Sequence, residues 1–172
     1  ILGKNTGHFP IEYEYTPDGV EDTLREYLQL EKRSRPTVAV PDLPARPPVL
    51  CAGCPHRSSF YLVRSVFGKK TVYCNDIGCY TLMVYPPLAA IDSCVCMGGS
   101  IGMAHGLEKA GVGEKVVAIL GDSTFMHGGI PALVNMFYNR SRSTVIVLDN
   151  RTTAMTGHQG HPASGLSARN EK

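Results

Sequence analysis

Two side chains that can bind a metal ion stand at matching distances behind two short apolar segments. Asp122 lies two residues beyond the run Val116–Leu120, and Asn150 lies two residues beyond Thr144–Leu148. A carboxylate, an amide oxygen and one backbone carbonyl just beyond Asn150 are too few ligands for a cage made by protein alone. They suit Mg²⁺, whose octahedron is completed by phosphate oxygens and water. The spacing therefore predicts a site for a magnesium-bound diphosphate.

The residues around these two ligands fit the same interpretation. Gly121 lets the backbone approach a ligand closely. Thr152, Thr153 and Thr156, together with the amides around Gly157, could hold phosphate oxygens in a nest or at a helix N-terminus.

A strand–helix–strand unit is needed to bring these residues together. Both apolar runs are rich in β-branched residues and too short for helices, so we expect buried parallel strands. Between them, Gly128–Asn139 has apolar residues at helical spacing, with Pro131 acceptable in a first turn. The apolar positions are Ile130, Leu133, Val134 and Phe137. The crossover places both strand ends at one edge of the sheet, where open α/β sheets bind ligands.

The preceding residues repeat this alternation. Pro55 opens a helix that we place at Arg57–Phe67, with Phe60, Leu62, Val63 and Val66 available for packing. Further elements are a strand at Thr71–Asn75, a strand at Ile91–Cys96 and a helix at Gly99–Ala110. The predicted fold class is α/β: a doubly wound, mostly parallel sheet with helices on both faces.

The N-terminal part has a different composition. Residues 1–34 are expected to form an appendage with one helix, capped by Asp18 with Glu21 three residues on. Its apolar stripe is Val20, Leu24, Tyr27 and Leu28. Residues 35–48 contain five prolines and are expected to be an extended linker. Residues 49–172 then form the predicted α/β domain.

One metal-binding motif and three further sequence blocks carry a resemblance to a known family. G-D-S at 121–123, followed by D-N at 149–150, resembles the thiamin diphosphate motif, although Ser123 stands where a third glycine is usual. Three blocks resemble the larger (alpha) subunit of indolepyruvate:ferredoxin oxidoreductase. They are C-A-G-C-P-H-R at 51–57, N-D-I-G-C-Y at 75–80 and N-R-T-T-A-M-T-G-H-Q at 150–159. The resemblance runs from about Pro47 to Gly165.

This resemblance implies the thiamin diphosphate-binding fold, with this chain supplying the diphosphate-binding domain. It implies Asp122, Asn150 and the Thr152 carbonyl as Mg²⁺ ligands. The expected cofactor-binding residues are His56, Ile77, Gly78, Cys79, Tyr80, Met97, Gly98, Gly99, Gly121, Asp122, Ser123, Asn150, Thr152, Thr153, Ala154, Met155 and Thr156. The family activates the cofactor with a glutamate from a separate domain. No equivalent stands out here, which leaves His56 and His158 as candidate catalytic side chains.

By resemblance, the complete enzyme oxidatively decarboxylates arylpyruvates to aryl-acetyl-CoA and passes electrons through [4Fe–4S] clusters to ferredoxin. The implied partners are the remaining domains of the larger subunit, a smaller partner subunit, ferredoxin, the arylpyruvate and coenzyme A. This chain alone is expected to be inactive. The alternatives are another thiamin diphosphate-dependent 2-oxo acid decarboxylase or synthase, another 2-oxoacid:ferredoxin oxidoreductase, and a structural metal-binding module built on cysteines.

The cysteines bear on the last alternative. Cys51, Cys54 and Cys79 have a spacing that could supply three thiolates to a cluster or to Zn²⁺. In related enzymes a fourth cysteine beyond the thiamin site completes such a set, and this sequence has none there. The other interpretation is uncharged thiols packed near the cofactor. Cys74 and Cys94 fall inside predicted strands and are expected to be small buried hydrophobic residues.

The composition excludes several classes of protein. The chain is 43% hydrophobic and 19% charged, as expected for a globular domain. A net charge of +2 is too small to indicate a nucleic acid or an anionic membrane as partner. No apolar run approaches the length of a membrane span. Six cysteines in this class of chain favour a reducing, cytoplasmic setting. Because the sequence begins without Met, we expect a fragment of a larger subunit.

Overall fold

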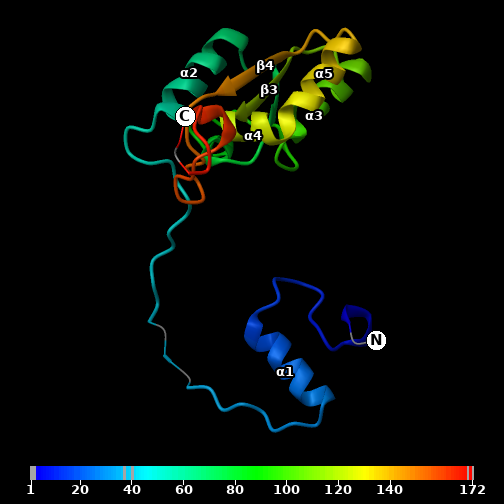
Figure 1. The fold of residues 1–172 in the computed structure, drawn as a ribbon, viewed down its shortest axis with the longest axis vertical. Helices are drawn as coiled ribbons and strands as arrows, with labels where there is room; N and C mark the ends of the chain where they lie inside the picture. The colour runs from blue at the N-terminus through cyan, green and yellow to red at the C-terminus, as the bar shows by residue number, and fades with distance from the viewer. Residues whose placement is uncertain (1–2, 37, 40, 170, 172) are drawn as a thin grey trace. The chain divides into compact units, whose positions relative to one another are not determined.

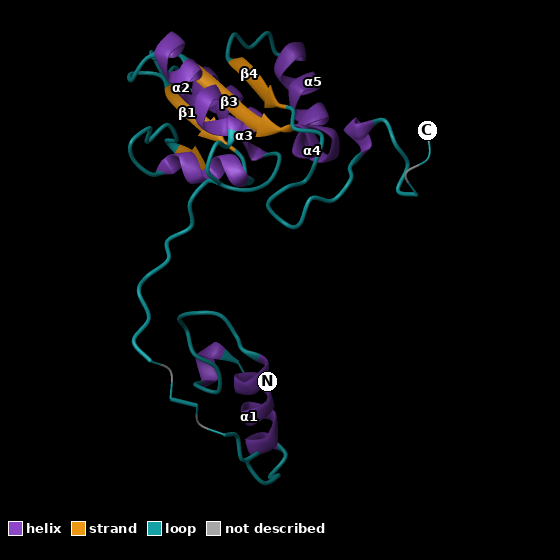
Figure 2. Cartoon of the chain, turned by 90° about the vertical axis from the view of Figure 1, so that its left-hand side faces the viewer, coloured by secondary structure: helices purple, strands orange, loops and turns teal. Residues whose placement is uncertain are grey.

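The computed structural model describes residues 3–36, 38–39, 41–169 and 171. The chain divides into two compact units, Ile1–Arg46 and Pro47–Lys172 (Figures 1 and 2). Within the described ranges, no helix is both long enough and apolar enough to cross a membrane.

The larger unit is built on a parallel sheet of four strands in the order β2-β1-β3-β4. The strands are β1 (Val72–Asn75), β2 (Ser93–Cys94), β3 (Val116–Gly121) and β4 (Thr144–Leu148). Strand β3 is buried along its whole length, because it has a neighbour on each side and helices on both faces. The chain runs outward from β1 to β2, then crosses to β3 and β4. The loops after β1 and β3 therefore diverge at a topological switch point.

Helices cover both faces of this sheet, which confirms the predicted doubly wound α/β fold (Figure 1). Helix α2 (Pro55–Phe67) lies on one face, and α3 (Gly99–Lys109) and α5 (Ile130–Tyr138) lie on the other. Side chains of β3 alternate between the two cores, as strand geometry requires. Val117 and Ile119 pack with Phe60 of α2, whereas Ala118 and Leu120 pack with Ile101 of α3.

The helix predicted at Gly128–Asn139 begins earlier than expected. The chain turns helical at α4 (Asp122–Thr124), passes through a π-helical turn, η3 (Phe125–Gly129), and continues as α5. Gly129 faces the core so closely that a Cβ there would lie 2.9 Å from both Leu120 and Phe125. The sequence prediction relied on the 3.6-residue period of an α-helix. Phe125–Gly129 departs from that period, so the helical residues before Gly128 were not predicted.

Two predictions about strand and helix packing are wrong. The strand expected at Ile91–Cys96 is only the two-residue β2, which pairs with β1 alone and forms an edge of the sheet. Cys94 is therefore exposed rather than buried. Of the four residues of α2 predicted to pack, Phe60 and Val63 face the core, whereas Leu62 and Val66 are exposed, because the apolar face of this helix is narrower than the sequence pattern suggested. Two 3₁₀ segments, η2 (Cys79–Val84) and η4 (Pro162–Ser164), complete the unit.

The N-terminal unit contains a 3₁₀ turn, η1 (Lys4–Thr6), and one helix, α1 (Pro17–Tyr27). The predicted cap at Asp18 is wrong. Thr16 is the N-cap, and its hydroxyl accepts a hydrogen bond from the Gly19 amide at 3.1 Å. Pro17 takes the first helical position, which its fixed φ favours. Among the described residues α1 buries none, so the predicted stripe is largely exposed.

Candidate functional site

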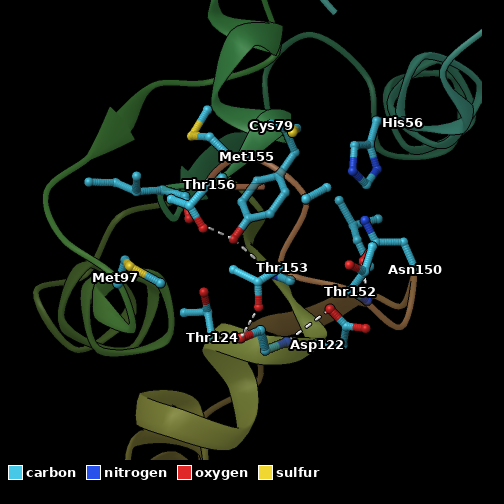
Figure 3. Close-up of a pocket in the computed structure, with 17 residues that line it drawn as sticks. His56, Cys79, Met97, Asp122, Thr124, Asn150, Thr152, Thr153, Met155 and Thr156 are labelled. Atoms are coloured by element: carbon cyan, nitrogen blue, oxygen red, sulfur yellow. Dashed lines mark hydrogen bonds between the residues drawn. The ribbon is translucent and has the colours of Figure 1, made fainter. Parts of the chain in front are cut away.

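A pocket lies where the loops after β1, β3 and β4 meet the start of α2, at the carboxyl ends of the strands (Figure 3). It holds about 530 Å³ of empty space, its mouth included. All the predicted cofactor-binding residues line this pocket except Gly98 and Gly99. Thr124 and Leu148 also line it and were not predicted from the sequence. The lining residues are His56, Ile77, Gly78, Cys79, Tyr80, Met97, Gly121, Asp122, Ser123, Thr124, Leu148, Asn150, Thr152, Thr153, Ala154, Met155 and Thr156.

Asp122 is a buried carboxylate at the floor of this pocket. Its Oδ1 accepts a hydrogen bond from the Ser123 amide at 2.9 Å, and its Oδ2 accepts one from the Arg151 amide at 2.7 Å. The Nε2 atom of His161 lies 3.2 Å from the same Oδ2. These neighbours fix the carboxylate in place, and each oxygen has lone-pair capacity beyond its backbone hydrogen bond.

The chain turns sharply after β4 and brings Asn150 and Thr152 to the same pocket. Arg151 has a φ of +58°, in the left-handed region. The Asn150 side-chain oxygen accepts a hydrogen bond from the Thr152 amide at 3.2 Å, which closes the turn. Figure 3 shows Asn150 and Thr152 on the side of the pocket near His56, with Met97 on the opposite side. Polar residues from the ends of two neighbouring strands, Asp122 and Asn150, thus line one pocket. Their role as metal ligands stays a prediction.

The loop that follows is a small hairpin closed by Gln159. Thr153 and Gln159 form an antiparallel bridge with hydrogen bonds of 2.9 and 3.2 Å between their backbones. The Gln159 side chain accepts a hydrogen bond from the Thr156 hydroxyl and donates one to the Thr156 carbonyl, both at 2.7 Å. The Thr153 hydroxyl donates to the Ser123 hydroxyl at 2.9 Å. A hydroxyl of this loop is therefore hydrogen-bonded to one from the loop after β3.

Tyr80 connects the loop after β1 with the end of β3. Its hydroxyl accepts a hydrogen bond from the Gly121 amide at 2.9 Å and donates one to the Ile77 carbonyl at 3.2 Å. A Cβ on Gly121 would lie 3.0 Å from the ring, and one on Gly78 would lie closer still. Both glycines are needed because the Tyr80 ring fills the space beside them. Burial raises the pKa of Tyr80, so its phenol stays neutral.

His56 lies at the start of α2 with its ring edge-on to that of Tyr80, at a centroid distance of 5.9 Å. Burial lowers the pKa of this imidazole, although the Asp122 carboxylate acts in the opposite direction. His56 is consequently neutral near pH 7 and can both donate and accept a proton in the pocket. His158 is not among the residues that line the pocket. A catalytic role for either histidine stays a prediction.

Gly98 and Gly99 serve the packing of α3. Gly98 has a φ of +86°, and a Cβ there would lie 3.3 Å from the backbone of Gly128 in the π-helical turn. Ser100, the next residue of α3, donates hydrogen bonds to the fully buried Asp76, which follows β1. Its amide donates at 2.9 Å and its hydroxyl at 3.0 Å. These contacts hold the start of α3 against the loop after β1. A direct contact of Gly98 or Gly99 with a cofactor stays a prediction.

The positions of the cysteines bear on the alternative of a cysteine-based metal site. Cys54 and Cys79 are partly buried against the core below α2, and Cys51 is exposed. Burial raises the pKa of the Cys79 thiol, and the neighbouring Cys54 and Cys51 act in the same direction. In the part of the chain that the structure describes, no group of three or more His, Cys, Asp or Glu side chains could hold a metal ion. Cys51, Cys54 and Cys79 as cluster ligands stay a prediction.

A doubly wound sheet with a pocket at its switch point defines this part of the chain as an α/β ligand-binding domain. The family model described as "Thiamine pyrophosphate enzyme, C-terminal TPP binding domain" matches residues 76–172. The chain belongs to this family.

Relatives with a curated name agree with one another. An indolepyruvate oxidoreductase subunit IorA from Thermococcus kodakarensis is 52% identical over 188 residues, covering 96% of this chain. The subunits of the same name from Archaeoglobus fulgidus and Methanothermobacter marburgensis are each 42% identical, covering 96% and 100% of this chain. The chain spans 28% of the length of each of these three relatives.

Proposed function

We propose that the chain binds the magnesium-diphosphate end of thiamin diphosphate in an enzyme that oxidatively decarboxylates arylpyruvates such as indolepyruvate. The products are the aryl-acetyl-CoA and CO₂, and ferredoxin accepts the electrons. The observation that carries the proposal is the pocket at the switch point, where Asp122 and Asn150 meet the ordered hydroxyls of Ser123 and Thr153. The family match supports the cofactor, and the names of the relatives support the substrate.

The donor set fits Mg²⁺. Asp122 supplies a buried carboxylate oxygen, Asn150 an amide oxygen and Thr152 its backbone carbonyl. These are hard oxygen ligands, and their number leaves coordination positions for phosphate oxygens and water. We therefore assign the metal to these three residues.

The hydroxyls and amides of the hairpin would hold the phosphate groups. Ser123, Thr153 and Thr156 present hydroxyls to the pocket, and Ala154 and Met155 continue the same loop. Because Gln159 and Ser123 already order this loop, little conformational entropy would be lost on binding.

The middle of the cofactor would lie against apolar groups. Ile77, Met97, Leu148 and Met155 line the pocket and would exclude water from it. When bound, thiamin diphosphate would supply the carbanion chemistry that decarboxylation of a 2-oxo acid needs. The neutral His56, which also lines the pocket, could hold or pass a proton near the bound substrate.

The complete enzyme needs parts that this chain does not provide. We place the activating glutamate on another domain of the larger subunit and the [4Fe–4S] clusters in the assembled enzyme. The relatives are named as a subunit, which supports a smaller partner subunit. Ferredoxin and coenzyme A are the further partners of the proposed reaction. The free cysteines suit a reducing, cytoplasmic setting.

The complete enzyme can test this proposal by reduction of a viologen dye with indolepyruvate and coenzyme A. We expect dye reduction that is lost in Asp122→Ala, and none from the 172-residue chain alone. Carbon dioxide release without dye reduction would instead favour a non-redox thiamin diphosphate decarboxylase. Dye reduction with a short 2-oxo acid but not with an arylpyruvate would favour another 2-oxoacid:ferredoxin oxidoreductase.

A further inference from the structure

We infer that His161 is a positioning residue for the metal-binding carboxylate of Asp122, an inference that rests on the proposed function. His161 directly precedes the 3₁₀ segment η4 and lies 39 positions beyond Asp122 in the sequence. Its side chain is 1% exposed, and its Nε2 atom lies 3.2 Å from Asp122 Oδ2. A histidine in a surface loop seldom becomes buried in this way without a partner.

The hydrogen bonding of the ring indicates which nitrogen carries the proton. Nδ1 accepts a hydrogen bond from the Ala163 amide at 3.3 Å, so this nitrogen presents its lone pair. In a neutral imidazole the proton is then on Nε2, which faces Asp122. The ring thus joins the start of η4 on one side to the carboxylate on the other.

Nε2 has no better acceptor than Asp122. Across the residues that the structure describes, this buried atom has no aligned hydrogen-bond partner, although Oδ2 lies at contact distance. A buried N–H group that stays unpaired costs free energy. The carboxylate orientation that brings Oδ2 onto Nε2 is therefore favoured over its alternatives.

The two carboxylate oxygens consequently have unequal roles. Oδ2 accepts from the Arg151 amide and faces His161, whereas among the described residues Oδ1 accepts from the adjacent Ser123 amide alone. Oδ1 is the oxygen with the greater remaining capacity to bind a cation. Groups that orient a ligand in this manner change the affinity of a metal site by about 10- to 100-fold.

Two variants separate the two nitrogens of His161. His161→Asn keeps a polar atom near the Nδ1 position for the Ala163 amide but does not reach Asp122. His161→Gln places an amide N–H close to the Nε2 position. The full chain is titrated with Mn²⁺ in place of Mg²⁺ at saturating thiamin diphosphate, and bound Mn²⁺ is measured by electron paramagnetic resonance. Thermal unfolding of the metal-free variants gives a separate readout.

We expect the Mn²⁺ dissociation constant to rise about 10- to 100-fold in His161→Asn and to change much less in His161→Gln. Wild-type Mn²⁺ affinity in His161→Asn would overturn the inference. So would equal losses of Mn²⁺ affinity in the two variants that match their losses of thermal stability. Asp122→Ala distinguishes this result from failure of the proposed function. If Asp122→Ala also binds Mn²⁺ and cofactor normally, the proposed metal site itself is wrong.

A measurement on the unmodified chain guards against a variant that fails to fold. Nitrogen-15 NMR of the histidine rings should show the His161 proton on Nε2, with a resonance that shifts when Mg²⁺ and thiamin diphosphate are added together. A proton on Nδ1, or a resonance that does not shift although the cofactor is bound, would contradict the inference.

Discussion

The Tyr80 hydroxyl accepts a hydrogen bond from the Gly121 amide, at 2.9 Å, across the two central strands of the sheet. Tyr80 follows β1 and Gly121 ends β3, so this contact joins the two loops that diverge at the switch point. The ring occupies the space beside Gly121, and the peptide that follows carries Asp122. The position of Asp122, the proposed metal-binding carboxylate, therefore depends on a residue that lies 42 positions earlier in the sequence.

Gly121→Ala is expected to destabilise the fold, because the added Cβ would lie 3.0 Å from the Tyr80 ring. Overpacking of this kind costs about 1–3 kcal/mol. Urea unfolding of the two proteins measures the difference. Gly102→Ala is the matched control, since a Cβ at this position in α3 meets nothing within 4 Å. It should leave the free energy of unfolding unchanged or raise it by up to about 1 kcal/mol. Equal effects of the two changes would contradict the role given to Tyr80.

Tyr80→Phe removes only the hydroxyl and leaves the ring. The Gly121 amide then loses its acceptor in a buried position, and we expect a loss of about 1–3 kcal/mol in the free energy of unfolding. Relative to wild type, amide hydrogen exchange should be accelerated more at Gly121 than at Val117, a buried residue in the same strand that reports on global unfolding. Unchanged exchange at Gly121 would show that another group satisfies this amide.

Glu108 makes the stability of the chain sensitive to acid. Hydrogen bonds from the Ser143 hydroxyl, the Arg142 and Ser143 amides and the Ser141 hydroxyl lower the pKa of Glu108 from 4.5 to about 2. Since the folded-state pKa is the lower one, the stabilisation is present above pH 4.5 and is lost as the pH falls toward 2.

Glu108→Gln should therefore lower stability at neutral pH, by about 1 kcal/mol because the site is only partly buried. The difference from wild type should shrink as the pH is lowered from 4.5 toward 2, which unfolding curves at several pH values can measure. A difference that stays constant across this range would show that the carboxylate charge is not the cause.

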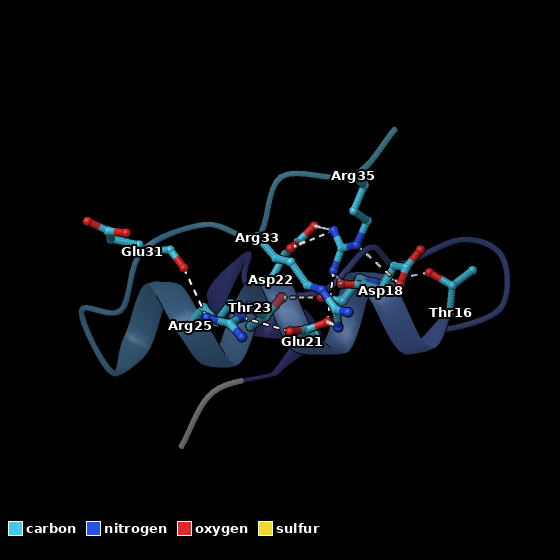
Figure 4. A network of polar contacts seen from close by, with 10 residues as sticks. Thr16, Asp18, Glu21, Asp22, Thr23, Arg25, Glu31, Arg33 and Arg35 are labelled. Atoms are coloured by element: carbon cyan, nitrogen blue, oxygen red, sulfur yellow. Dashed lines mark hydrogen bonds and ion pairs between the residues drawn. The ribbon is translucent and has the colours of Figure 1, made fainter. Parts of the chain in front are cut away.

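Arg35 ties the beginning of the proline-rich segment to α1 (Figure 4). One guanidinium nitrogen donates to both oxygens of Asp22 at 2.8 Å, and the other donates to Glu21 at 3.1 Å. Arg33 has a single looser contact with Glu21, at 3.7 Å, and is the matched control. Arg35→Ala should speed amide exchange across α1 by a small factor, about two to five, and more so in low salt. Arg33→Ala should change it less, and the reverse order would refute this assignment.

The contact from Arg35 also lowers the pKa of Asp22, with its side-chain hydrogen bond as the largest cause. Because the folded-state pKa lies below 3.8, this stabilisation is present above pH 3.8 and is lost as the pH falls through the folded-state value. At low pH, the rate of amide hydrogen exchange in α1 of the wild-type chain should therefore approach the rate in Arg35→Ala. Persistence of the difference at low pH would contradict this view.

The sequence was sufficient for the parts of the site that follow directly from strand patterning. Val116–Leu120 and Thr144–Leu148 are apolar and β-branched, so the strands and the polar residues at their ends could be placed from local sequence. The contacts of Tyr80 with Gly121 and of His161 with Asp122 could not, because they join segments that are distant in the sequence.

Other differences arose where local patterns have more than one solution. The spacing of Asp18 and Glu21 matches a capping box, but Thr16 followed by Pro17 makes the better helix start. Cys94 lies in an apolar segment, yet its strand is short and at the sheet edge, so the thiol is exposed. The role of Gln159 depends on a hairpin that becomes visible only in three dimensions.

Calorimetric titration of this chain with thiamin diphosphate, with Mg²⁺ and again with excess chelator, tests the central claim most directly. All proposed ligands of the metal and the diphosphate are in this chain, so binding should require Mg²⁺ and should be lost in Asp122→Ala. Glu114→Ala is the matched control, because this exposed carboxylate in the same unit does not line the pocket and should be dispensable. Binding that persists in chelator or in Asp122→Ala would contradict the assignment of this pocket as the magnesium-diphosphate site.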